Sequence, residues 1–169
     1  MGYVIVAGPI AVGKTYYCHE VLNGKAVIPG FEDISFVASR NVHPLLGGSV
    51  KPPKGDWLLH CCINNEWPYG RTHEAALEFG VVYGCIVLVS KVQDLDRKLQ
   101  KRQGRRARIY DHGVKRLIDG YCSWFKLMEE VHMEYKILYV WGDVPVEQYI
   151  EVYKRECFSI LRYSEGNGA

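Results

Sequence analysis

The sequence predicts an α/β fold in which helices cover both faces of a mainly parallel, five-stranded sheet, a three-layer α/β/α sandwich. Short apolar runs alternate along the chain with segments whose apolar residues recur at helical spacing. Such alternation is typical of parallel strands joined by crossover helices, and continuous apolar runs are typical of strands buried on both sides. The 169 residues suffice for one domain, which we expect over residues 1–163, with 164–169 as a flexible tail.

The first half of the chain contains three predicted strands. Residues 3–7 form a continuous apolar run, which a glycine-containing stretch and a helix over residues 14–22 follow. Residues 26–28 and 57–63 are the second and third predicted strands. Residues 29–53 are rich in Gly and Pro and indicate loops, whereas residues 72–79 suit a helix.

The second half predicts two further strands and three helices. Residues 81–89 contain the fourth strand, and Ser90 with Gln93 forms a capping-box signature at the start of a helix. A long amphipathic helix is predicted over residues 114–128, and residues 135–140 form the fifth strand. Pro145 is expected to open the last helix, whose buried stripe would consist of Val146, Tyr149, Ile150, Tyr153 and Cys157.

The composition is that of an ordinary soluble protein. Apolar residues make up 48% and charged residues 24% of the chain. No apolar run reaches the roughly 18 residues that span a bilayer, so we expect no membrane partner. The six cysteines contain no C-x-x-C pair, which indicates reduced thiols in a cytoplasmic protein.

One segment carries an exact nucleotide-binding motif. Residues 8–15 are Gly-Pro-Ile-Ala-Val-Gly-Lys-Thr, which match G-x-x-x-x-G-K-[ST] between a predicted strand and a predicted helix. Glycines allow a backbone to wrap closely around phosphate oxygens, and the amide groups at a helix N-terminus supply a positive field. The residues that would surround the phosphates are Gly8, Ala11, Val12, Gly13, Lys14 and Thr15.

These eight residues resemble the P-loop of the P-loop NTPase superfamily. The resemblance implies that Lys14 reaches the terminal phosphates of ATP and that the Thr15 hydroxyl ligates Mg²⁺. The third predicted strand lacks the aspartate that many members carry at its end, and Glu66 is the candidate to replace it as a metal ligand, a solvated loop acid being the alternative. No N-K-x-D sequence is present, which disfavours a GTPase.

The order of the elements resembles that of the small nucleoside and nucleotide kinases. In that group a carboxylate after the second strand orients the acceptor hydroxyl or takes its proton. Asp33, with Glu32 next, occupies the corresponding place here, and a plain loop acid is the alternative.

A basic segment at residues 97–108 occupies the place of the arginine-rich lid of these kinases. Seven of the 21 Lys and Arg residues lie in it, and the other 14 are outnumbered by 19 acidic residues. The resemblance implies that Arg102 and Arg105 stabilise charge in the transition state and that Arg106 contacts the nucleotide. A solvated basic helix face and a nucleic-acid contact are the alternatives.

The turn between the fifth strand and the last helix resembles the segment that packs along adenine in these kinases. This comparison assigns Gly142, with Asp143 and Val144, to base binding. A simple strand-to-helix turn is the alternative, with Asp143 near the helix cap.

We therefore expect a kinase-like phosphotransferase that moves the γ-phosphate of Mg·ATP to a nucleoside, nucleotide or other small acceptor. One alternative is a sulfotransferase-like protein with an adenosine-bisphosphate-type sulfuryl donor, no Mg²⁺ and His60 as a possible base. Another is an ATPase or nucleotide-binding module that contacts nucleic acid or a protein partner through residues 97–108.

Overall fold

The computed structural model describes residues 2–9, 11–34, 36, 43–44, 55–63, 81–103 and 114–166. Within these residues one sheet contains six strands in the order β2-β3-β1-β4-β5-β6. Five strands are parallel, and β6 at one edge is antiparallel to β5. The strands are β1 (Gly2–Gly8), β2 (His43–Pro44), β3 (Trp57–Cys62), β4 (Val81–Val89), β5 (Tyr135–Tyr139) and β6 (Ile150–Val152).

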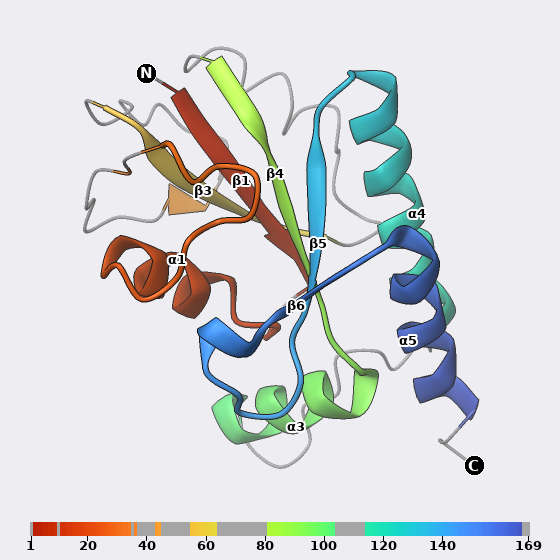
Figure 1. Ribbon diagram of the computed structural model, residues 1–169. Helices are drawn as coiled ribbons and strands as arrows, with labels where there is room; N and C mark the ends of the chain where they lie inside the picture. Colours follow the sequence, from red (N-terminus) through yellow and green to blue (C-terminus); the bar gives the residue numbers. More distant parts are fainter. Residues whose placement is uncertain are drawn as a thin grey trace.

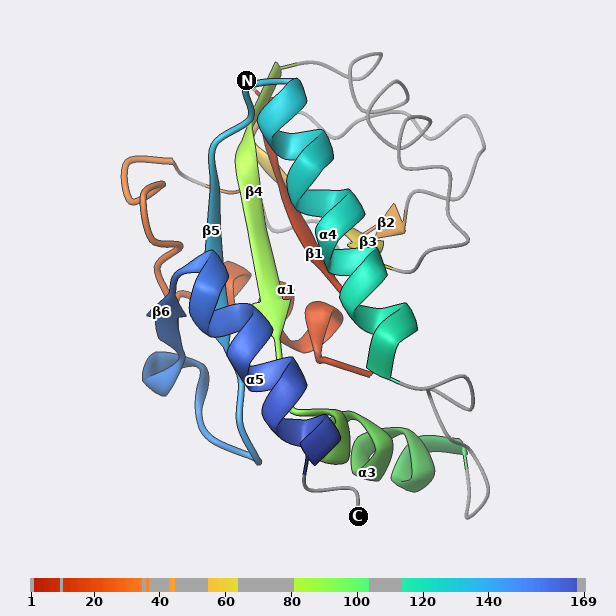
Figure 2. The same cartoon turned by 90° about the vertical axis from the view of Figure 1, so that its right-hand side faces the viewer.

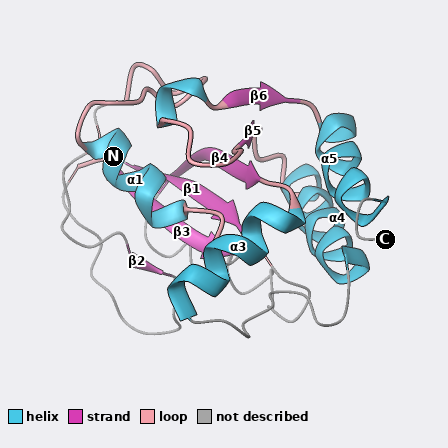
Figure 3. Ribbon diagram, turned by 90° about the horizontal axis from the view of Figure 1, so that it is seen from below, coloured by secondary structure: helices cyan, strands magenta, loops and turns pink. Residues whose placement is uncertain are grey.

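The helices of the described residues lie on both faces of this sheet and at one end of it. Helix α1 (Lys14–Leu22) covers one face, whereas α4 (Val114–Glu130) and α5 (Lys154–Gly166) cover the other (Figures 1 and 2). Helix α3 (Val92–Gln103) lies across the carboxyl ends of the parallel strands, the end of the sheet that Figure 3 faces. The predicted α/β class with helices on both faces of a mainly parallel sheet is confirmed.

Strand β1 is the centre of the hydrophobic core. All seven of its residues are buried, as expected for a continuous apolar run between two parallel neighbours. It pairs with β3 on one side and β4 on the other, with Gly8 opposite Cys62 and Ala7 opposite Val87. The segment that follows Gly8 therefore leaves the sheet between the carboxyl ends of β3 and β4.

Helix α4 covers the core on the face of the sheet opposite α1. Its buried residues Leu117, Tyr121, Trp124, Phe125 and Met128 follow the helical spacing seen in the sequence. The Tyr121 hydroxyl donates a hydrogen bond to the Leu88 carbonyl at 2.6 Å, so this buried polar group has a partner on β4.

The second predicted strand is wrong. Residues 26–28 form no strand, and the strand that follows α1 is β2 instead. Ile28 is buried but Val27 is 64% exposed, so one side chain anchors the segment to the core. Residues 26–28 pair with none of the described strands. The helix predicted over residues 72–79 lies outside the described residues.

The last predicted helix is wrong in its first part. After Pro145 the chain makes a short 3-10 helix, η1 (Val146–Gln148), and then enters β6, where Val152 pairs with Ile137. Helix α5 begins only at Lys154, where the Glu156 carboxylate accepts a hydrogen bond from the Tyr153 N–H at 2.9 Å. It continues to Gly166, so residues 164–166, predicted as tail, are helical.

Asp56, a half-buried carboxylate, connects strands at the amino end of the sheet. One of its oxygens accepts hydrogen bonds from the Tyr83 hydroxyl at 2.7 Å and from the Gly2 N–H at 3.0 Å. The Tyr83 hydrogen bond lowers the pKa of Asp56, and the Gly2 bond acts in the same direction. The ionised form is therefore the one that stabilises the fold.

We expect Asp56→Asn to lower the melting temperature at pH 7 but not at low pH. A carboxyl group whose pKa is lower in the folded state stabilises above its unfolded pKa of about 3.9, and this contribution is lost as pH falls through the folded-state value. Thermal melts from pH 7 to pH 3 should show the two proteins converging below about pH 4. A constant difference across that range would contradict this role of the charge.

Among the described residues, no helix has both the length and the apolar character that a membrane crossing requires.

Candidate functional site

The loop from Gly8 to Thr15 joins the central strand β1 to α1. The helix after β1 packs on one face of the sheet, and the helices after β4 lie at its carboxyl end and on the other face (Figures 1 and 3). Neighbouring strands whose connections diverge in this way leave a crevice outside their carboxyl ends, where α/β proteins bind ligands. The Gly8–Thr15 loop therefore lies at the edge of the sheet where a ligand is expected.

The backbone of this loop has a shape that most residues disfavour. Gly13 has φ 100° and ψ 34°, and Ala11 has φ 67°, so both are left-handed. Glycine adopts this conformation freely, whereas a residue with a Cβ such as Ala11 loses about 1–2 kcal/mol. Strain of this kind is concentrated at functional segments, and here it gives the loop its tight curvature.

Close packing explains why residue 8 is glycine. A Cβ at Gly8 would lie 2.7 Å from the Val12 Cγ1 and 3.2 Å from the Leu88 carbonyl oxygen. Val12 is fully buried and fixes the middle of the loop to the core. The Gly8 carbonyl accepts a hydrogen bond from the Ile63 N–H at 2.8 Å, which ties the start of the loop to the end of β3.

Lys14 folds back over the loop. Its ammonium group donates to the carbonyl oxygens of Gly8 at 3.0 Å and of Pro9 at 2.9 Å. Burial lowers the pKa of Lys14, and the positive charge of Arg102 lowers it further, although nearby thiols oppose these effects. Lys14 is thus a half-buried cation at the start of α1.

The N-terminus of α1 has no side-chain cap within the described residues. Gly13 is the N-cap residue and provides no side chain, and the first turn contains no acidic residue. The positive end of the helix dipole is therefore not neutralised locally. The exposed Thr15 lies in this first turn beside Lys14, so a hydroxyl group, an ammonium group and backbone amides are available together.

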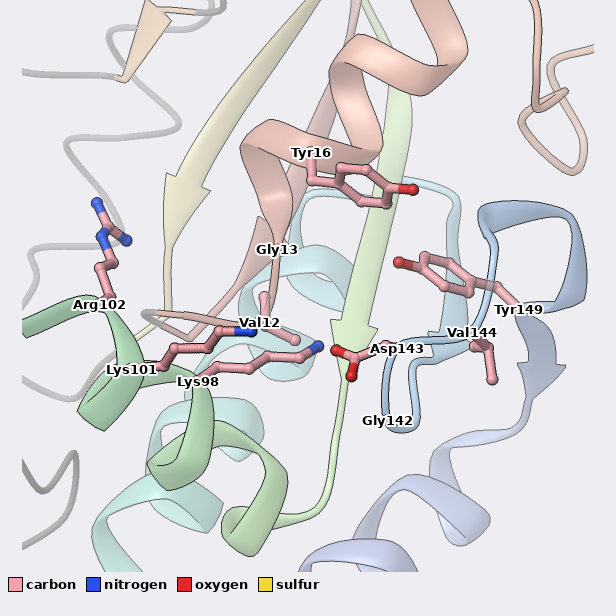
Figure 4. Close-up of a pocket in the computed structure, with 10 residues that line it drawn as sticks. All are labelled: Val12, Gly13, Tyr16, Lys98, Lys101, Arg102, Gly142, Asp143, Val144 and Tyr149. Atoms are coloured by element: carbon pink, nitrogen blue, oxygen red, sulfur yellow. The ribbon is translucent and has the colours of Figure 1, made fainter.

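A cavity of 440 Å³ opens beside the start of α1 (Figure 4). This volume is within the range of about 300–1,000 Å³ that is usual for small-molecule sites. Three segments that are distant in sequence surround it: the end of the Gly8–Thr15 loop with the first turn of α1, helix α3, and the turn after β5. Its lining residues are Val12, Gly13, Tyr16, Lys98, Lys101, Arg102, Gly142, Asp143, Val144 and Tyr149.

Helix α3 supplies three cations to this cavity. Lys101 and Arg102 follow Lys98 by three and four residues, so the three side chains share one face of the helix. Figure 4 shows Arg102 at the end of the cavity opposite Tyr149, with the two lysines between them. Burial lowers the pKa of Lys98, while the carboxylates of Asp94 and Asp143 oppose that shift.

The turn after β5 is attached to α3. The Gly142 N–H donates to the Asp94 carboxylate at 3.2 Å, and another Asp94 oxygen lies 3.4 Å from the Arg97 guanidinium. Gly142 has φ 53°, a left-handed conformation that suits glycine. Asp94 therefore holds the turn, and the Asp143 that follows, against the cationic helix.

Two tyrosines flank the other side of the cavity. Tyr16 is 51% exposed, and its hydroxyl faces that of Tyr149 in Figure 4. Tyr149 stacks on Tyr17 with ring centroids 6.0 Å apart, and burial raises the pKa of Tyr149 to about 12. The backing ring of Tyr17 keeps Tyr149 in place, which leaves a firm aromatic surface for a planar ligand.

The structure brings most of the described candidate residues together. Gly8, Ala11, Lys14 and Thr15 belong to the loop itself, and the other members of the group line the cavity: Val12, Gly13, Arg102 and Gly142. Candidates Glu66, Arg105 and Arg106 lie outside the described residues. His60 pairs with Val6, two positions before the end of β3.

Asp33 is not brought to this site. It is exposed, in a turn that the Ile34 N–H closes onto the Phe31 carbonyl at 3.2 Å. The Phe31 ring packs so closely on Gly84 that a Cβ there would lie 2.4 Å from it, and Gly84 pairs with Val4. Val4 is four residues before Gly8, which corresponds to roughly 13 Å along a strand. This packing favours a place for Asp33 away from the loop, and its role beside the phosphates stays a prediction.

Four lining residues escaped the sequence analysis as site residues: Tyr16, Lys98, Lys101 and Tyr149. The spacing of Lys98, Lys101 and Arg102 on one helical face was the available signal for the lysines. Tyr149 was assigned to a buried helical stripe, and no local pattern could show that the chain turns back there toward α1.

Comparisons of the chain with models of protein families, with curated proteins and with solved structures found no match.

Proposed function

We propose that the Gly8–Thr15 loop is a P-loop that binds the phosphates of a nucleoside triphosphate, and that the protein is a kinase-like phosphotransferase. ATP with Mg²⁺ is the donor that the sequence suggests, and the acceptor is a small molecule with a free hydroxyl or phosphate. The order of the strands, with β1 between β3 and β4, agrees with the kinase-like arrangement.

The observation that carries this proposal is the Lys14 ammonium group, which folds over the loop onto the Gly8 and Pro9 carbonyls at an uncapped helix N-terminus. A half-buried cation beside a helix N-terminus, whose dipole has the same sign, is stabilised when an anion lies next to both. A chain of phosphates supplies that anion, and the motif G-x-x-x-x-G-K-[ST] is the sequence typically found around one.

The same residues suit the transfer of a phosphoryl group. When the oxygen of a hydroxyl acceptor bonds to the γ-phosphorus, the bond from that phosphorus to the bridging oxygen breaks, and the hydroxyl proton passes to solvent water. Negative charge builds up on the phosphoryl oxygens and on the leaving diphosphate. Lys14 and the backbone amides of the loop would hold the leaving phosphates, and Arg102 would stabilise the transferring group.

The residues at the loop fit a magnesium ion that is held mainly by substrate and water. Mg²⁺ retains several waters and binds through few protein groups when phosphates are present. The Thr15 hydroxyl, exposed in the first turn of α1, would be the protein ligand. The described residues contain no cluster of three or more His, Cys, Asp or Glu for a metal, and this type of site needs none.

The position of the basic residues favours a small ligand over a nucleic acid. Lys98, Lys101 and Arg102 line a concave cavity beside the loop, and Arg97 on the same helix is paired with Asp94. Lys101 and Arg102 are also exposed, so binding of an oligonucleotide that falls steeply with salt is the result that would favour the nucleic-acid alternative. The cavity that these three cations line is the support for assigning them to the nucleotide.

The test is stabilisation by ATP or GTP, each with and without Mg²⁺. A ligand at about 100 times its Kd adds roughly 2.7 kcal/mol to the free energy of unfolding. At about 2–4 °C per kcal/mol for this size, the melting temperature should rise by about 5–10 °C with the magnesium complex. The rise should be smaller without the metal.

Adenosine 3′,5′-bisphosphate serves as the contrasting ligand. Stabilisation by this bisphosphate alone, independent of Mg²⁺, would contradict phosphoryl transfer and favour sulfuryl transfer. Absence of any shift with every nucleotide would contradict the proposed P-loop.

A further inference from the structure

The part of the cavity farthest from Arg102 holds two side chains of opposite charge. The Asp143 carboxylate and the Lys98 ammonium point toward one another there, beneath Tyr149 (Figure 4). Both residues line the same cavity as Gly13, where the phosphate-binding helix begins. A nucleotide whose phosphates lie at Gly13 and Lys14 would therefore extend its base toward Asp143, Lys98 and Tyr149.

The backbone on both sides of Asp143 is held by hydrogen bonds before any ligand binds. The residue before it is tied to α3 by the hydrogen bond from the Gly142 N–H to Asp94 at 3.2 Å. The Val144 N–H closes the turn onto the Trp141 carbonyl at 3.4 Å. A preorganised acceptor loses little entropy on binding and can discriminate between ligands that differ in one polar group.

Asp143 and Lys98 together are more complementary to the hydrogen-bonding edge of guanine than to that of adenine. A carboxylate has two acceptor oxygens, and guanine presents two adjacent donors, N1–H and the 2-amino group. Its O6 is an acceptor beside them, within reach of an ammonium donor. Adenine presents only its 6-amino donor, next to the N1 lone pair, which a carboxylate repels.

We propose that Asp143 and Lys98 form a base-recognition site that favours guanine over adenine, so that the nucleotide of this protein is a guanine nucleotide. Asp143 accepts hydrogen bonds from N1–H and the 2-amino group, Lys98 donates to O6, and the base lies against Tyr149. This inference rests on the proposed phosphate site. It changes the expected donor from an adenine nucleotide to a guanine nucleotide and leaves the phosphate contacts as proposed.

The experiment measures Kd by titration calorimetry for GTP, ITP, XTP, ATP and inorganic tripolyphosphate, all with Mg²⁺. A bidentate contact to a base gives a discrimination of about tenfold or more, so GTP should bind about tenfold more tightly than ATP. ITP lacks the 2-amino group and should fall between them. Tripolyphosphate has no base and reports the phosphate site alone.

Asp143→Asn is the decisive variant. An amide can donate to the C2 carbonyl of xanthine but cannot accept from both guanine donors, so the variant should lose the GTP preference and bind XTP more tightly than wild type does. Its affinity for tripolyphosphate should not change. Asp119→Asn, an exposed residue on α4, is the matched control and should keep the wild-type order.

Lys98→Met gives an independent readout. It should weaken GTP, ITP and XTP, which all carry O6, more than it weakens ATP. Equal affinities of wild type for GTP and ATP, or a GTP preference that survives Asp143→Asn, would overturn the base assignment while leaving the phosphate site intact. If the wild-type protein binds none of these ligands, including tripolyphosphate, the proposed function is overturned as well.

Discussion

Replacement of Lys14 by alanine is expected to abolish phosphoryl transfer while the fold remains. The ammonium group reaches over the loop, at 2.9 and 3.0 Å from two of its carbonyl oxygens. A ligand phosphate would take over those contacts. Loss of one preorganised donor in such sites lowers the rate by about 10²–10³-fold, and kcat/KM should fall by at least that factor.

Lys25→Ala is the matched control for this variant. Lys25 follows α1, its side chain is 62% exposed, and it forms a 3.8 Å ion pair with Glu20. Exposed ion pairs contribute about 0–1 kcal/mol, so this variant should keep both its activity and its stability. Circular dichroism and thermal melts check that the Lys14 variant is folded. Full activity of folded Lys14→Ala would contradict the assignment of the loop.

The largest loss of stability is expected for Phe125→Ala. Phe125 is fully buried, and its ring contacts Tyr135 at 5.2 Å, Phe158 at 5.8 Å and Tyr121 at 6.0 Å between centroids. Truncation of a buried phenylalanine costs about 3–5 kcal/mol, because it removes apolar contacts and leaves a cavity between α4, α5 and the sheet. The melting temperature should fall by about 6–20 °C.

Urea denaturation measures this effect on the free energy of unfolding. The midpoint should shift with little change in slope if the native state is otherwise intact. Lys126→Ala at the next position, where the side chain is 79% exposed, should change stability by less than about 0.5 kcal/mol. A loss below about 1 kcal/mol for Phe125→Ala would mean that this part of the core repacks to fill the space.

The sequence determined the parts of the molecule that depend on local pattern. The apolar run of β1, the helix that begins at Lys14, the long α4 and the strands β3, β4 and β5 all follow from periodicity and capping. The Gly8–Thr15 loop was likewise evident, because its shape requires glycine where φ is positive or packing is close, and these requirements appear directly as residue types.

Pairing between distant segments was decided only by the tertiary structure. Tyr149, Ile150 and Tyr153 have helical spacing, yet the chain there pairs with β5, because an edge strand gains hydrogen bonds from its neighbour that no local pattern records. The reverse holds for residues 26–28, whose apolar character found no partner strand.

The same distinction separates the two halves of the candidate site. Its phosphate end lies within eight consecutive residues, so a motif could identify it. Its other end combines α3 with the turn after β5, whose closeness depends on the hydrogen bond between Gly142 and Asp94, 48 residues apart. Asp33 is the converse case: its place in the order of elements suggested the site, but Phe31, two residues earlier, packs on Gly84 in the first half of β4, before the carboxyl end where the loop lies. Local backbone demands appear in a sequence, whereas the side chains that face one cavity are selected by how the whole chain packs.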